Sequence, residues 1–341
     1  MSALARDLDR IAAETGFSGV VRVDTGDDIE VVRAYGLADR AHAIANEPDT
    51  QFGIASGTKG LTALVVMRLV EEGALSLSTP ARSILGADLP LVDERVTVEH
   101  LLAHLSGIGD YLDEELDLDF TDYLLPVPAQ RLATTEAYLE VLDGHPQKFP
   151  PGERFAYCNS GYVLLALIAE RVAGAPYHDL VRDLVCRPAG MGDTAFLRSD
   201  ELPGRAAVGY VQVQGTCRTN AFHLPVIGSG DGGIYTTAAD VAMFWRALFA
   251  GSIVREATLA EMLRERSAAG ADRSYGLGLW LPAGGRAVRL HGGDTGVAFV
   301  TVHDQERLMT WTLLSNTVEG TGAIAGRLEQ ERTAGSPSLP R

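Results

Sequence analysis

The sequence predicts an α+β fold, in which an antiparallel sheet of five or more strands carries helices from both chain ends and contains a mainly helical insertion. Two strand patterns lie near the N-terminus, and four more follow between residues 275 and 316. The chain between them reads mostly as helices and loops. Because a two-stranded hairpin is marginally stable alone, we expect the early pair to join the late strands in one sheet.

The first elements have clear local signals. Residues 3–15 repeat apolar side chains at helical spacing, which predicts an amphipathic helix. Residues 19–23 and 29–36 are apolar runs around the turn Asp-Thr-Gly-Asp-Asp, which predicts a hairpin. From Thr58 to Glu72 the apolar residues again follow a helical period.

Later elements follow the same rules, and the strand patterns are joined by short turns that predict an antiparallel meander. Threonines precede several of the helices as expected N-caps, and Asp240 is expected to complete a capping-box variant. The expected helices are 97–107, 134–144, 160–174, 236–251 and 322–332, and the expected strands are 275–281, 287–293, 297–303 and 307–316. The two terminal helices should cover one face of the sheet.

This organisation predicts two domains. Residues 1–70 and 215–341 would form the sheet domain, and residues 71–214 would form the helical insertion. We expect the active site between them.

Composition narrows the function classes. The chain has 341 residues and a net charge of −16, which disfavours binding to nucleic acid or to anionic membrane surfaces. Its three cysteines form neither a disulfide framework nor a zinc pattern. The charged N-terminus lacks the apolar run of a signal sequence, and no apolar run is long enough to span a bilayer, so we expect a cytoplasmic protein.

Lysine is rare in this chain: only Lys59 and Lys148 are found among 29 basic residues. Lys59 follows Ser56 by three positions at a helix start, so the two side chains share one face. A serine hydroxyl is a poor nucleophile without a base, and arginine cannot be that base because it stays protonated. A lysine can, when burial and a helix N-terminus favour its neutral form. A serine N-cap beside a surface lysine is the structural alternative.

Two further motifs could complete a site. Tyr157 and Asn159 project the same way in extended backbone, so a phenol and a carboxamide would face one cleft. The stretch His291-Gly292-Gly293 ends a predicted strand, where glycines allow another backbone to approach closely. Taken singly, each motif is more often structural.

Together these motifs resemble those of the serine β-lactamase and penicillin-binding protein superfamily, most closely its class C β-lactamase, DD-carboxypeptidase and related esterase branch. The blocks FGIASGTKGLTA, LLAHLSGI, PPGERFAYCNSGY and GDGGIYTTAADVAMF are also similar to the family's, so the resemblance covers nearly the whole chain. It implies the same architecture, an antiparallel sheet with a helical insertion and the site between them.

The resemblance also implies roles. Ser56 would be the acylated nucleophile, Lys59 would activate it, and Tyr157 would share proton transfer with the leaving group. Asn159 would bind the acyl side of the substrate, and His291 would line the far wall. The oxyanion hole would be the backbone N–H groups of Ser56 and of Asp294, which follows Gly292 and Gly293.

Several other features of the sequence have weaker links to function. GSGDGG at 228–233 matches a dinucleotide-binding pattern but lacks the adjoining strand and helix, so a loop at the cleft rim is expected, with Ser229 contacting substrate. His100 and His104 have a metal-ligand spacing without a third ligand, which favours core or capping roles. Cys158 is expected to be a buried small residue, and the acidic run 113–122 a solvated loop or lid.

The sequence therefore predicts a serine hydrolase without cofactor or metal, acting through an acyl-enzyme on Ser56. An intracellular esterase or amidase is preferred, because His291 stands where β-lactamases carry lysine and no signal sequence is found. Its substrate would be a small ester, amide or β-lactam. The alternatives are a β-lactamase or D-Ala-D-Ala carboxypeptidase, an acyltransferase, and a non-catalytic scaffold; the oligomeric state is open.

Overall fold

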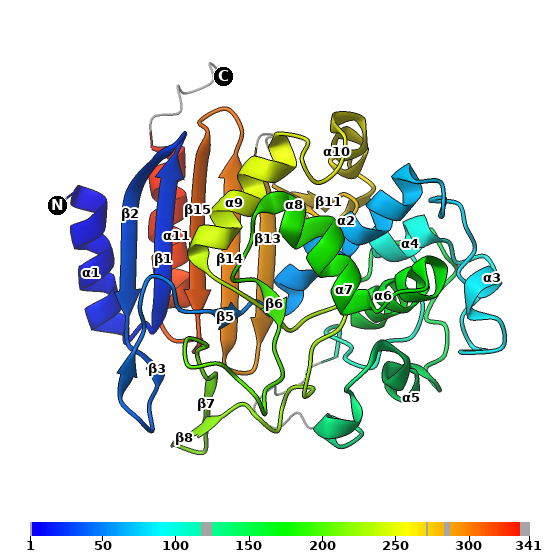
Figure 1. Ribbon diagram of the computed structural model, residues 1–341, viewed down its shortest axis with the longest axis horizontal. Helices are drawn as coiled ribbons and strands as arrows, with labels where there is room; N and C mark the ends of the chain where they lie inside the picture. Colours follow the sequence, from blue (N-terminus) through cyan, green and yellow to red (C-terminus); the bar gives the residue numbers. More distant parts are fainter. Residues whose placement is uncertain (1, 117–124, 271, 283–286, 335–341) are drawn as a thin grey trace.

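One large antiparallel sheet organises the protein in the computed structural model, which describes residues 2–116, 125–270, 272–282 and 287–334. Its eight strands follow the order β10-β11-β12-β13-β14-β15-β1-β2 (Figure 1). Their bounds are β1 Gly19–Thr25, β2 Asp28–Tyr35, β10 Ser267–Ala268, β11 Arg273–Tyr275, β12 Trp280–Pro282, β13 Ala287–Asp294, β14 Val297–Asp304 and β15 Met309–Ser315. The expected α+β fold is confirmed.

The N-terminal hairpin joins the C-terminal meander as expected. β1 pairs with β15 in antiparallel register, with Val21 opposite Leu313, so the first strand of the hairpin lies beside the last strand of the meander. Both side chains are fully buried. The N-terminal hairpin is therefore stabilised by residues almost 300 positions away.

The two terminal helices cover one face of this sheet. In Figure 1, α11 (Thr321–Thr333, red) lies behind the strands and α1 (Ala3–Thr15, blue) lies beside β2, and their buried residues share one core cluster. α1 begins at the Ser2 cap and ends at Gly16, whose φ of 71° suits glycine. The buried side chains of both helices pack on alternate residues of the central strands, which forms a second, smaller core beside the main one.

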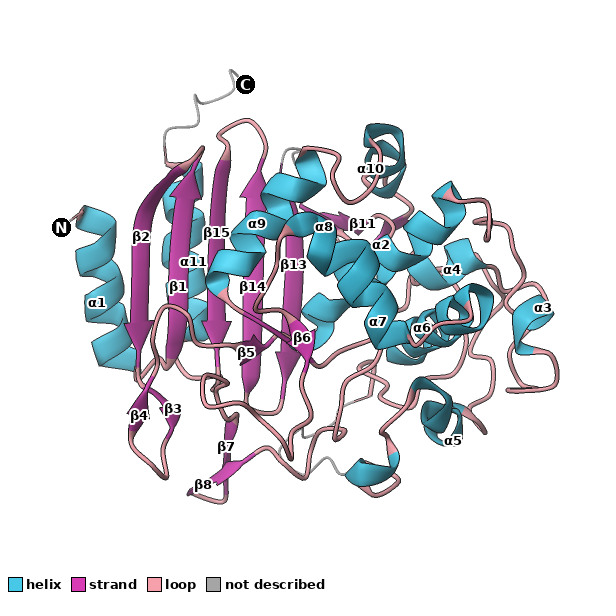
Figure 2. Cartoon of the chain, viewed as in Figure 1, coloured by secondary structure: helices cyan, strands magenta, loops and turns pink. Residues whose placement is uncertain are grey.

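The main core lies on the opposite face and continues into the helical part. Figure 2 shows the helices that lie over this face and beside the sheet. Its central helices are α2 (Thr58–Glu71), α6 (Asn159–Ala173) and α9 (Ala238–Phe249), and α2 and α6 are almost entirely buried. The remaining helices are α3 Arg82–Leu85, α4 Val98–Leu102, α5 Leu139–Leu142, α7 Tyr177–Val181, α8 Arg187–Ala189 and α10 Glu256–Met262. Small sheets add β3 Leu37–Asp39 with β4 Ile44–Ala45, β5 Phe52–Gly53 with β9 Ile234–Thr236 and β6 Ala195–Phe196, and β7 Tyr210–Val213 with β8 Thr216–Thr219.

Some predicted elements were wrong in extent. The expected strand 275–281 is two short strands, β11 and β12, because the chain turns at Gly278 (φ 82°) to bury Leu277 and Leu279 in the main core. The expected helix 97–107 is only α4, because His104 adopts a left-handed backbone conformation with φ of 56°.

The helix expected over 134–144 is a 3₁₀ turn followed by α5. Thr237 caps α9 as expected, but the Asp240 carboxylate accepts hydrogen bonds from Asp193 and Thr194 instead of returning to the cap. The domain boundaries at 70 and 214 stay a prediction. In the described parts of the chain, no helix combines the length and apolar character needed to cross a bilayer.

Candidate active site

Ser56 lies in a strained turn between β5 and α2. It is the middle residue of the 3₁₀ turn Ala55–Gly57, which leads directly into the helix. Ala55 has a φ of 43°, an unfavourable value for a residue with a side chain. The Ile54 N–H donates to the Ile234 carbonyl (3.0 Å), and the Thr58 hydroxyl donates to the Ala55 carbonyl (2.8 Å). The surrounding structure therefore holds the turn in place.

Lys59 is buried directly behind Ser56, with only 2% of its surface exposed. Its ammonium nitrogen lies 2.9 Å from Ser56 Oγ, 2.7 Å from Asn159 Oδ1 and 2.8 Å from the Asp231 carbonyl oxygen. Three partners match the three donors of an ammonium group. The lysine is thus fixed against the serine, and the surface lysine of the structural alternative is excluded.

Tyr157 completes the contact with the nucleophile. Its hydroxyl and that of Ser56 are hydrogen-bonded, and its ring centroid lies 4.8 Å from Lys59 Nζ. Burial, and then the charge of Glu114, raise the pKa of Tyr157 well above its usual range. The phenol therefore keeps its proton at neutral pH and is suited to donate it.

Asn159 is oriented by a loop that neighbours the site. Its Oδ1 faces Lys59, while Nδ2 donates to the Leu112 carbonyl (2.9 Å) and to Glu114 Oε1 (3.1 Å). Both amide hydrogens are used, so a substrate reaches Nδ2 only by displacing one of these acceptors. Asp110 lies in the same loop and caps α6 by accepting from the backbone N–H groups of Asn159 and Ser160 at 2.7 and 2.9 Å.

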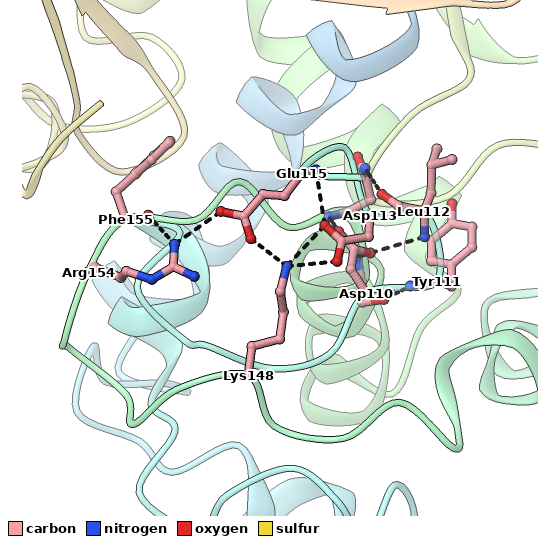
Figure 3. Close-up of polar contacts among 10 residues, drawn as sticks. Asp110, Tyr111, Leu112, Asp113, Glu115, Lys148, Arg154 and Phe155 are labelled. Atoms are coloured by element: carbon pink, nitrogen blue, oxygen red, sulfur yellow. Dashed lines mark hydrogen bonds and ion pairs between the residues drawn. The ribbon is translucent and has the colours of Figure 1, made fainter. Parts of the chain in front are cut away.

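Ion pairs fix the outer part of this loop (Figure 3). Lys148 Nζ lies 2.9 Å from Asp113 and 2.8 Å from Glu115, and Arg154 lies 3.0 Å from Glu115. The second lysine of the chain therefore holds the loop that orients Asn159. Residues 117–122 of the acidic run lie outside the described residues.

Strand β13 passes very close to the nucleophile turn at Gly292. A Cβ at this position would lie 2.0 Å from the Ile54 carbonyl oxygen and 2.8 Å from the Gly57 nitrogen. Only glycine allows this approach, which agrees with the close backbone contact expected at the glycines of this strand. At Gly293 a Cβ would meet no described atom within 4 Å, so only at Gly292 does the packing require a glycine.

Asp294, the expected second oxyanion donor, ends β13 and lines both cavities beside Ser56. Its carboxylate accepts from the Thr295 N–H at 2.7 Å. Burial raises the pKa of Asp294 to about 7, and the charges of Asp231 and Glu114 act in the same direction.

Two cavities meet at Ser56. The larger, about 1010 Å³, is lined by Tyr157, His291, Arg273, Arg289 and Trp280 among others. Desolvation and the positive charges of Arg289 and Arg273 lower the pKa of His291, so this wall carries a neutral imidazole. His291 thus lies on the cleft wall expected of it.

The smaller cavity, about 290 Å³, lies on the other side of Ser56 and is bordered by Asn159 and Asp231. Most of its remaining wall is apolar, formed by Tyr138, Leu197, Leu202, Leu224, Pro225, Val226 and Tyr235. Ser229 was expected to contact substrate, but it lines neither of these two cavities and is only 1% exposed. Its hydroxyl is buried without a hydrogen-bond partner in the described chain.

Sequence reasoning missed several residues that hold the site. Asp231 gives Lys59 its backbone acceptor, and its carboxylate accepts from the Tyr111 hydroxyl at 2.6 Å. Asp110 and Glu114 orient Asn159. Asp231 lies in the glycine-rich stretch 228–233, which the sequence predicted to be a loop at the cleft rim, and its contact with Lys59 was not predicted.

The two histidines spaced like metal ligands have structural roles, as expected. His100 forms a capping box with Thr97, and His104 is buried among aromatic rings. No cluster of three or more His, Cys, Asp or Glu suited to a metal ion was found in the residues that the structure covers. Cys158 is buried, as predicted.

Comparison with known proteins identifies the family. The family model described as Beta-lactamase matches residues 4–334. A putative penicillin-binding protein, PbpX, from Bacillus subtilis (strain 168) is 29% identical over 80% of this chain and 64% of its own length. Esterase EstB from Burkholderia gladioli is 35% identical over 52% of this chain and 46% of its own length. The chain thus spans less than two thirds of the length of each of these two relatives.

Solved structures agree. A penicillin-binding protein from Bacillus halodurans superposes with a TM-score of 0.90 at 35% identity, covering 95% of this chain and 99% of that one. D-amino acid amidase from Ochrobactrum anthropi SV3 shares the fold, with a TM-score of 0.80 at 24% identity over 98% of this chain and all of that one. By the match over nearly its whole length, the chain belongs to the β-lactamase family of serine hydrolases.

Proposed function

We propose that this protein is an esterase or amidase that acts through an acyl-enzyme on Ser56. The observation that carries the proposal is the buried Lys59, whose nitrogen is held 2.9 Å from Ser56 Oγ by two further hydrogen bonds. In its neutral form this amine can take the serine proton as the hydroxyl attacks a carbonyl carbon. The N–H groups of Ser56 and Asp294 would then stabilise the oxyanion.

The raised pKa of Tyr157 supports a division of roles in which Lys59 is the base and Tyr157 is the proton donor. A phenol that stays protonated cannot deprotonate Ser56, but it can pass its proton to the departing alcohol or amine and regain one through Lys59. In deacylation, water would attack the acyl carbon and give one proton to Lys59. As the bond from the acyl carbon to Ser56 Oγ breaks, Lys59 would return this proton to Oγ, which restores the serine hydroxyl and releases a carboxylic acid.

The two cavities support separate binding sites for the acyl group and the leaving group of the substrate. Tyr157 lines only the larger cleft, so the leaving group that it protonates departs there. Asn159 lines only the smaller cavity, which would therefore hold the acyl group. A volume of about 290 Å³ holds roughly ten non-hydrogen atoms at about 30 Å³ each. We therefore expect a small or medium apolar acyl group and few limits on the leaving group.

The experiment is a series of p-nitrophenyl esters from acetate to dodecanoate, with intact mass recorded during turnover. We expect an acyl adduct that is absent in Ser56→Ala, and kcat/KM that rises to about eight carbons and then falls. Leu224→Trp, which narrows the smaller cavity, should move the optimum to shorter chains. Val318→Trp, which lies on the wall of the larger cleft, should leave the optimum in place. No Ser56 adduct with any ester or with a fluorophosphonate would favour the scaffold and refute the proposal.

Penicillin binding is the second candidate, because the Bacillus halodurans protein matches this chain over almost its full length. A neutral His291 stands where β-lactamases carry a charged lysine, so we expect a slow or stable cephalosporin adduct on Ser56 instead of rapid turnover. A D-Ala-D-Ala peptide tests carboxypeptidase activity, and an added alcohol or amine tests acyl transfer. The intracellular location stays a prediction.

A further inference from the structure

His104 is a buried titratable group that the proposed mechanism does not use. It follows α4, is 1% exposed, and adopts a φ of 56°. A left-handed conformation costs about 1–2 kcal/mol for a residue with a side chain, so its retention needs an explanation. The imidazole contacts the segment 155–158, with its centroid 5.7 Å from the Phe155 ring and 4.3 Å from the Tyr157 ring.

This segment carries Tyr157, and His104 binds it on both sides of the tyrosine. The Ala156 N–H donates to the His104 carbonyl oxygen at 3.0 Å, and the Cys158 N–H donates to His104 Nδ1 at 3.1 Å. The centroids of the His104 and Tyr157 rings lie 4.3 Å apart. A single residue thus fixes the backbone before and after Tyr157 and also contacts its ring.

The hydrogen bond from Cys158 also determines the state of the imidazole. Because Nδ1 accepts a backbone N–H, the proton of the neutral ring lies on Nε2. Nε2 is buried with no hydrogen-bond partner within the described chain and is surrounded by aromatic rings. Burial, and then the charge of Lys59, lower the pKa of His104 well below its usual range. A ring held neutral in one tautomer suits a positioning role and not proton transfer.

We propose that His104 is a positioning residue, whose ring packs against Tyr157 and places its hydroxyl for proton transfer to the leaving group, while the bonds to Ala156 and Cys158 hold the segment in place. The inference rests on the proposed acyl-enzyme function. It predicts a selective defect, because p-nitrophenoxide departs without a proton whereas an alkoxide needs one from Tyr157. A histidine that only supports the core would weaken both reactions equally.

The test compares ethyl butanoate with p-nitrophenyl butanoate in His104→Asn. Asparagine tolerates the left-handed backbone and can still accept from Cys158, but it lacks the ring. We expect kcat/KM for the ethyl ester to fall at least tenfold more than for the p-nitrophenyl ester. In a Tyr157→Phe background the selective loss should shrink to less than twofold. An equal fall for both esters, or an unchanged selective loss in the Tyr157→Phe background, would overturn the proposal.

Two further variants guard against a folding artefact. Leu167→Ala truncates a buried side chain on α6. It should lower thermal stability and reduce kcat/KM for the two esters by the same factor. Tyr275→Leu leaves His104 intact but removes a ring 4.7 Å from it, and should give a smaller loss with the same selectivity. If His104→Asn does not fold, Tyr275→Leu decides, and a non-selective loss there refutes the role. Absence of Ser56-dependent turnover in the wild type would instead refute the proposed function.

Discussion

Gly292 offers a sharp test of the contact between the sheet and the nucleophile turn. In Gly292→Ala the new Cβ would start 2.0 Å from the Ile54 carbonyl oxygen, whereas such contacts are essentially never below 3.0 Å. The two backbones must therefore separate by at least about 1 Å. A displacement of this size at a reacting centre costs about 100-fold in rate, and overpacking costs about 1–3 kcal/mol of stability.

The matched control is the next residue. At Gly293 a Cβ would meet no described atom within 4 Å, so Gly293→Ala should change the free energy of unfolding by less than about 0.5 kcal/mol. The assays are kcat/KM with p-nitrophenyl butanoate and urea unfolding of both variants. Full activity in Gly292→Ala, or equal destabilisation by the two alanines, would show that the close approach of β13 does not determine the geometry of the nucleophile turn.

Three further predictions concern the charged groups of the site. Lys59→Arg should lower kcat by about 10³-fold, measured with the same ester, because arginine stays protonated; retained activity would refute Lys59 as the base. Asp294, whose pKa burial raises to about 7, binds its proton more tightly in the folded state, so its contribution to stability is full below about pH 3.8 and lost as pH rises through 7. Urea unfolding at pH 5 and pH 8 should therefore show a larger loss of stability in the wild type than in Asp294→Asn, and equal losses would contradict the shift. Asp110→Asn should cost about 1 kcal/mol of unfolding free energy, because one of the two capped N–H groups of α6 loses its acceptor; an unchanged midpoint in urea would count against the cap.

The fold was largely predictable because its signals are local or follow from pairing rules. The strands and the terminal helices each have a recognisable hydrophobic period. Because an isolated hairpin is marginally stable, its pairing with the strands of the meander could also be predicted. Two of the failures, the strand 275–281 and the helix 97–107, have a common cause. Gly278 and His104 redirect the chain through left-handed conformations, which apolar periodicity alone does not reveal.

The candidate site was predictable to the extent that its chemistry lies in short motifs. Ser56 and Lys59 share a turn of helix, and their contact follows from spacing alone. The residues that orient them do not share this property. Asn159 and Asp231 are 100 and 172 positions from Lys59, and no local pattern predicts that they accept from one nitrogen.

This long-range arrangement makes Lys59 a cross-link as well as a candidate base. Its nitrogen joins α2 to the start of α6 and to the glycine-rich stretch around Asp231. An apolar side chain at this position would leave the Asn159 and Asp231 oxygens without a donor, a loss of about 1–3 kcal/mol for each. The same three bonds hold the amine toward Ser56, so fixing the helices against one another also fixes the reactive pair. Stability and reactivity therefore depend on the same atoms at this position, and a substitution that improves one should be tested for its effect on the other.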